Sequence, residues 1–174
     1  MTGNHTLDFF ALLAVAWILR RYRFMIKPFM LMEVFFHEVS HGLVNLFTLG
    51  KVHGLRLQWA GGGVCVTQGG SQILTALAGY CGAVVWGACI YLMGVYAGAY
   101  AANAILSGLI GFMALVTLAW VRNLQTLLIM LMLMGLLALP MYFNRFDFSH
   151  YLLQVIGLFV AVSAIQAPLH LIDG

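Results

Sequence analysis

Residues 28–47 read PFMLMEVFFHEVSHGLVNLF, an apolar run that also holds two glutamates and two histidines. Its length matches the roughly 20 residues that an α-helix needs to cross the hydrocarbon core of a bilayer. An acidic residue near the centre of such a helix costs about 2.5–3.5 kcal/mol. Glu38, among Phe35, Phe36 and Val39, therefore needs a compensating partner. This stretch predicts a membrane helix that carries a functional polar site.

The composition of the whole chain also indicates a bilayer. Of 174 residues, 63% are hydrophobic and 7% are charged, whereas a water-soluble domain carries about 25% charged residues. The net charge of +3 is scattered, so no basic patch indicates a nucleic-acid partner. Three cysteines without a CxxC pair exclude a disulfide scaffold. We expect one domain, residues 1–174, integral to the cell membrane and multi-pass.

Apolar segments separated by short loops predict an all-α polytopic membrane protein with about six transmembrane helices. The six candidates are residues 7–25, 28–47, 72–93, 96–119, 124–143 and 151–171. The first is the weakest, because its uninterrupted apolar run ends at Leu19, before three arginines. We expect that segment to form a short, tilted or partly interfacial helix.

The segment after the second candidate, residues 51–70, lacks a helical stripe. Val52, Leu55, Leu57 and Trp59 recur at roughly strand spacing, three glycines follow at residues 61–63, and an alternating pattern then resumes. This pattern predicts a small β-hairpin at a membrane face. The alternative is a plain glycine-rich loop.

Residues 37–41 read HEVSH, an HExxH motif. On a helix, His37 and His41 lie one turn apart on the same face, so their imidazoles can bind a single Zn²⁺ ion. Zinc lowers the pKa of a bound water to about 7, and Glu38 beside it can take the proton as general base. The alternative is a helix end at the membrane interface with solvated histidines.

A catalytic zinc site takes three protein ligands and one open position. The remaining acidic residues are Asp8, Glu33, Asp147 and Asp173. Asp8 begins a span and Asp147 lies in a polar loop, where water solvates both. Glu33, one turn before the motif, either supports the ligands or is an acid near the membrane surface. Asp173 follows Pro168, which would kink the last helix and turn the chain inward; otherwise Asp173 is a solvated acid near the terminus.

Two other polar residues have roles that the pattern leaves open. His170 lies one turn before Asp173 and could support or replace it as a ligand. Asn45 lies one turn after His41 and either orients a ligand or is simply a polar residue near a helix end.

An HExxH motif in a membrane helix, a glycine-rich segment after it and a late Asp-Gly together resemble the site-2 protease family of intramembrane zinc metalloproteases. In that family the third zinc ligand is the aspartate of a late NxxPxPxLDG motif. Asp173 and Gly174 match its Asp-Gly pair, and Pro168 matches its first proline. The resemblance therefore implies a Zn²⁺ ion bound by His37, His41 and Asp173.

The same late motif departs from the family pattern at two positions. Ile165 stands in the place of the asparagine, which is thought to assist substrate binding or the oxyanion, and His170 stands in the place of the second proline. The neighbouring Gln166 is a possible substitute for the asparagine.

The middle of the chain is similar to a divergent, protease-like branch with an HExxH motif, a hairpin, and GGS and AGYxG segments. Residues 69–71 read GGS and residues 78–82 read AGYCG. The resemblance implies that the hairpin offers a strand edge to an unwound substrate segment. Such a partner is needed because a transmembrane helix has its peptide bonds hydrogen-bonded internally.

The resemblance implies an intramembrane zinc metalloendopeptidase that cleaves a peptide bond in or next to a transmembrane segment of another membrane protein, with Glu38 as the catalytic base. The alternative is a protease-like membrane protein that binds metal or partner proteins without cleaving them; Ile165 favours it slightly, and the intact Glu38 argues against it. A metal transporter would need acidic or histidine residues in another facing helix, and residues 72–119 contain none.

Overall fold

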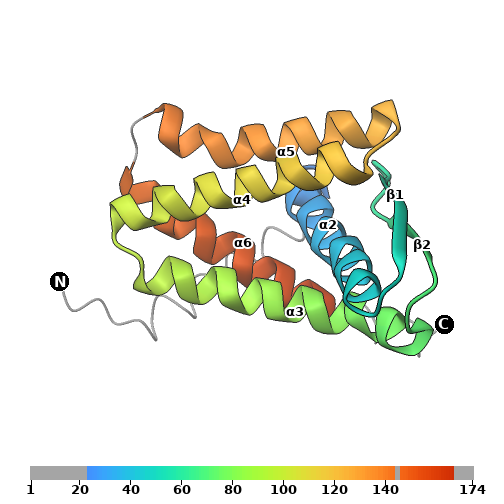
Figure 1. Ribbon diagram of the computed structural model, residues 1–174. Helices are drawn as coiled ribbons and strands as arrows, with labels where there is room; N and C mark the ends of the chain where they lie inside the picture. Colours follow the sequence, from blue (N-terminus) through green and yellow to red (C-terminus); the bar gives the residue numbers. More distant parts are fainter. Residues whose placement is uncertain (1–22, 144–145, 167–174) are drawn as a thin grey trace.

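The computed structural model describes residues 23–143 and 146–166. Its helices are α2 (Arg23–Phe47), α3 (Gln72–Tyr96), α4 (Ala99–Trp120), α5 (Leu124–Tyr142) and α6 (Phe146–Gln166). Two strands, β1 (Lys51–Leu57) and β2 (Gly63–Gln68), connect α2 to α3. In Figure 1, α3 to α6 run along a common direction, α2 is inclined to them, and the strands stand at one end of the bundle.

Four of the described helices are long and apolar enough to cross a membrane. The stretches that qualify are Gln72–Tyr96, Tyr100–Trp120, Leu124–Tyr142 and Phe148–Ile165. The helix with the HExxH motif, α2, is not among them, because its glutamates, histidines and Asn45 lower its hydropathy. These polar residues are nevertheless shielded, since α2 packs against α3, α6 and both strands.

The prediction of about six transmembrane helices is not matched, since the described residues form five helices and four of them qualify as spans. Residues 7–22 of the first expected span lie outside the described residues. Its last three residues, 23–25, instead begin α2, which continues through Pro28. A proline removes one backbone donor near the start of this 25-residue helix and does not end it.

The predicted hairpin is confirmed: β1 and β2 form a two-stranded antiparallel sheet in which Leu55 pairs with Cys65. The turn between the strands needs glycine, because Gly61 has a φ of 87° and Gly62 one of 150°. Leu55 and Leu57 point into the core and are 0% and 1% exposed. The hairpin is therefore packed onto the bundle and is not a loose loop.

Two contacts hold β1 against the turn between α4 and α5. Leu55 forms an isolated parallel bridge with Val121. The backbone N–H of Leu57 donates to the Thr126 hydroxyl at 2.9 Å. These contacts place β1 between the α4–α5 turn and β2, so that β2 is the outer strand.

Helices α3 and α6 make the most extensive contact between the described helices, and glycines face each other across it. A Cβ on Gly87 would lie 2.7 Å from the carbonyl oxygen of Gly157, and one on Gly157 would lie 2.6 Å from that of Gly87. Small residues at such contacts let two backbones approach in a membrane. This contact fixes the position of α3, which faces the HExxH motif.

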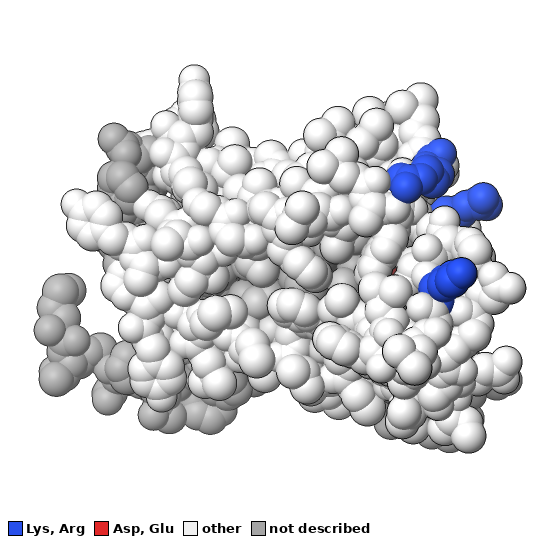
Figure 2. Space-filling model, in the orientation of Figure 1, with Lys and Arg blue, Asp and Glu red and all other residues white. Residues whose placement is uncertain are grey.

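Basic side chains gather at the end of the molecule that carries the hairpin (Figure 2). The lysine and arginines of the hairpin and the α4–α5 turn are Lys51, Arg56 and Arg122. The long flanks of the bundle carry exposed apolar side chains, among them Ile73, Leu115 and Leu118. This distribution suits a molecule whose flanks face lipid and whose end faces the headgroup region.

Candidate metal centre

The two histidines of the HExxH motif point toward one another from successive turns of α2. Their Nε2 atoms are 3.1 Å apart. Two nitrogens bound to one tetrahedral zinc ion at 2.0–2.1 Å are separated by about 3.3 Å. The observed spacing of His37 and His41 therefore fits a shared Zn²⁺ ion with little adjustment.

A carbonyl on α3 fixes the orientation of His41. Its Nδ1 lies 2.5 Å from the backbone oxygen of Thr75. Because a carbonyl oxygen only accepts, Nδ1 carries the proton and Nε2 keeps its lone pair. A hydrogen bond of this kind is what orients most metal-binding histidines. The donor chemistry of His41 thus also fits a metal.

Gly79 on α3 faces the histidine pair directly. A Cβ built on this residue would lie 2.5 Å from Nε2 of His37 and 2.5 Å from Nε2 of His41. Next to it, the Tyr80 ring packs edge-on against His37 with centroids 4.6 Å apart. Glycine at this position keeps open the space in front of the two Nε2 atoms, and Tyr80 restrains the His37 ring.

Glu38 is buried beside the pair, with 7% of its surface exposed. Its carboxylate accepts a hydrogen bond from the backbone N–H of Cys65 on β2. Gly63 leaves room for the side chain, since a Cβ there would lie 2.6 Å from Cγ of Glu38. Burial and the Glu38 charge raise the pKa of Cys65 to about 12, so this thiol stays uncharged. The hairpin therefore positions the carboxylate that the sequence predicts as general base.

A cleft of about 470 Å³ opens beside Glu38 and His41. One wall is β2, and another is the first turn of α3. The residues that line it are Glu38, His41, Asn45, Gly63, Val64, Cys65, Thr67, Gly69, Gln72, Thr75 and Ala76. The backbone N–H of Cys65 points from β2 to Glu38, so the edge of β2 that does not pair with β1 faces this site.

Asn45 is 1% exposed and braces the turn between β2 and α3. Its side-chain amide donates to the Gly69 oxygen at 2.8 Å. One turn later, the Thr48 hydroxyl accepts from the backbone N–H of Ser71, the residue that caps α3. Of the two roles left open for Asn45, the contacts show a structural one: it sets where α3 begins, and hence where Thr75 meets His41.

The predicted third ligand, Asp173, lies outside the described residues, as does His170. Within residues 23–143 and 146–166, no third histidine, cysteine, aspartate or glutamate joins His37 and His41 in a group that could hold a metal. Ile165, in the place of the family asparagine, is 58% exposed and is not among the cleft residues. The described part of the chain thus supplies two imidazole nitrogens and the Glu38 carboxylate.

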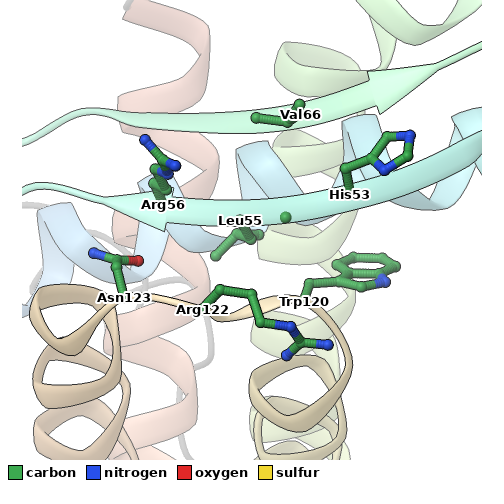
Figure 3. Close-up of a pocket in the computed structure, with 8 residues that line it drawn as sticks. His53, Leu55, Arg56, Val66, Trp120, Arg122 and Asn123 are labelled. Carbon is green, nitrogen blue, oxygen red and sulfur yellow. The ribbon is translucent and has the colours of Figure 1, made fainter.

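A second cavity, of about 180 Å³, lies between β1 and the α4–α5 turn, and two arginines are among its lining residues. Figure 3 shows the guanidinium groups of Arg56 and Arg122 pointing away from one another. Arg122 donates to the carbonyl oxygens of Leu118, Ala119 and Val121. It therefore caps the end of α4, and the two arginines do not converge on a common ligand.

Sequence reasoning found the motif residues but not the groups that position them, namely Gly63, Thr75 and Gly79. The only signal for Gly79 was its place in the AGYCG segment. No curated protein and no solved structure matches the chain. The model of one family, described as Peptidase M50B-like, matches residues 9–174. The protein is an integral membrane protein, and it belongs to the Peptidase M50B-like family, which is the site-2 protease family.

Proposed function

We propose that this protein is a zinc-dependent endopeptidase that cleaves a peptide bond in or next to a transmembrane segment of another membrane protein. The observation that carries the proposal is the pair of Nε2 atoms 3.1 Å apart with a buried carboxylate beside them in an open cleft. Membership of a peptidase family supports the reaction class.

His37 and His41 would hold the zinc ion together with Asp173, the third ligand that the late Asp-Gly pair predicts. When bound, zinc supplies Lewis acidity to the attacking water and to the scissile carbonyl. Glu38 takes a proton from that water and passes it to the leaving amine. The Cys65 N–H, which donates to the Glu38 carboxylate, would hold that side chain in position for this role.

The substrate would enter as an extended segment. In the described residues β2 has one partner strand, β1, and its other edge faces the cleft. An exposed edge can pair with an added strand through main-chain hydrogen bonds. Such pairing replaces the internal hydrogen bonds that a transmembrane helix loses when it unwinds.

The test is cleavage of a synthetic single-span peptide, rich in leucine with a central Asn-Pro pair, by the zinc-loaded full chain in lipid bicelles. We expect cleavage by the unsubstituted protein and none by Glu38→Gln. Cleavage that survives in Glu38→Gln contradicts the assigned chemistry. Zinc binding without cleavage by the unsubstituted protein would favour the alternative, a protease-like protein that binds metal or partners.

A further inference from the structure

Thr75, in the first turn of α3, presents two polar groups near the HExxH motif. Its carbonyl oxygen is used, because it accepts from His41 Nδ1 at 2.5 Å. Its hydroxyl oxygen is buried and has no hydrogen-bond partner in the part of the chain that the structure describes. Since a large majority of buried side-chain polar atoms have a partner, such a group needs an explanation.

Other hydroxyls in this chain show what a helical serine or threonine ordinarily does. Ser40, Ser107 and Thr117, all within helices, each donate to the carbonyl four residues earlier, at 2.7–2.8 Å. Thr48, in the turn directly after α2, does the same at 2.9 Å. This back-bonding satisfies the hydroxyl within its own helix. The carbonyl four residues before Thr75 is that of Ser71, and it accepts from the Thr75 backbone N–H at 2.9 Å. The Thr75 hydroxyl does not share it.

The position of Thr75 in the cleft indicates where a partner for its hydroxyl could come from. Thr75 lines the cleft with Glu38 and His41, on the wall formed by α3, whereas Gly63 to Cys65 belong to the wall formed by β2. A substrate strand that pairs with β2 carries backbone hydrogen-bonding groups along both of its edges. Pairing with β2 satisfies the groups of only one edge. A polar group on the α3 wall is placed to bind the other edge.

We propose that the Thr75 hydroxyl binds the backbone of the substrate segment beside the scissile bond. The inference rests on the proposed function. Thr75 contacts His41 at Nδ1, on the side of the ring away from Nε2. Its hydroxyl therefore serves a peptide group that flanks the scissile bond, and it contributes to substrate binding.

The experiment exploits the fact that the two groups of Thr75 can be separated. Thr75→Val removes the hydroxyl and keeps the carbonyl that holds His41, so zinc affinity should be unchanged. Thr75→Ser restores the hydroxyl. Thr117→Val is the matched control, because its hydroxyl is satisfied inside α4 by Met113. The probe is the leucine-rich peptide with the central Asn-Pro pair, and the full chain is loaded with zinc in bicelles.

Dissociation constants are measured for the probe with and without Thr75→Val in the inactive Glu38→Gln protein, and KM and kcat are measured in the active one. Loss of one neutral hydrogen bond should weaken binding by about 3- to 10-fold. The effect should appear in KM with little change in kcat, because the contact is made equally in the ground and transition states. Thr75→Ser should recover most of the loss, and Thr117→Val should show none.

Unchanged probe binding and KM in Thr75→Val would overturn the inference and assign the hydroxyl to an ordered water. A fall in zinc affinity in the same variant would also overturn it, since Thr75 would then act through His41 alone. Both outcomes leave the proposed function intact if Glu38→Gln remains inactive. A zinc-loaded unsubstituted protein that neither binds nor cleaves the probe would refute both proposals together.

Discussion

Gly79→Ala should remove zinc binding without unfolding the protein. The new Cβ would lie 2.5 Å from both Nε2 atoms, and real Cβ contacts are not shorter than 3.0 Å. Each ring, or the helix that carries the methyl group, must therefore shift by about 0.5 Å. Metal–ligand distances tolerate deviations of about 0.2 Å. The required shift exceeds that tolerance and affects both histidine ligands at once.

The expected loss of zinc affinity can be estimated from substitutions that disturb a metal site less. Changes to groups that merely orient a ligand lower metal affinity by about 10- to 100-fold. A methyl group placed against both ligand nitrogens should cost more than about 100-fold on the same scale. The helix itself should not suffer, because alanine is favoured over glycine in a helix interior by about 1 kcal/mol.

The assay is a competitive zinc titration of the purified protein against a chromophoric chelator, with circular dichroism recorded on the same samples. Gly135→Ala is the matched control, since this helical glycine has nothing within 4 Å of the position of a Cβ. We expect native helicity in both variants and zinc loss only in Gly79→Ala. Wild-type zinc affinity in Gly79→Ala would refute the inference that this glycine keeps the metal position open.

Three further substitutions test the supports of the site. Gly63→Ala places a Cβ 2.6 Å from Cγ of Glu38 and should displace this carboxylate. Peptide cleavage should then fall by about 100-fold while zinc remains bound, because a small displacement of a catalytic group lowers the rate by about that factor. Thr126→Val leaves the buried N–H of Leu57 without its acceptor, and chemical unfolding should show a loss of about 1–3 kcal/mol that Thr126→Ser avoids. Gly157→Ala presses on the backbone of α3, and overpacking there should cost about 1–3 kcal/mol in the same assay.

The convergence of the two histidines of the HExxH motif could be predicted from sequence because its geometry is local. Residues four apart on a helix share a face whatever surrounds them, so the spacing of His37 and His41 already determines that they converge. The hairpin could be predicted for the same reason. Alternating apolar residues and three consecutive glycines favour a strand pair through neighbouring residues alone. Both predictions depended on neighbours in the chain and not on the packing of the bundle.

What could not be predicted depends on how the helices pack. Gly79 and Thr75 matter because α3 meets α2 at one particular register, and the close contact of Gly87 with Gly157 sets that register. Nothing in the spacing within a single helix reveals such a contact. The expected count of six spans was not matched partly because residues 28–47 were counted as a span from their length. The polar residues of α2 lower its hydropathy below that of the other four helices, and α2 is enclosed by other elements.

The most direct test of the central claim is the zinc content of the purified full chain, measured with its His37→Ala, Asp173→Ala and Glu38→Gln variants. His53→Ala, on the exposed face of β1, serves as the histidine control. We predict one zinc ion per chain in the unsubstituted protein, in Glu38→Gln and in the control, with loss in the two ligand variants. An unsubstituted protein that binds no zinc, or full zinc retention in His37→Ala, would contradict the account.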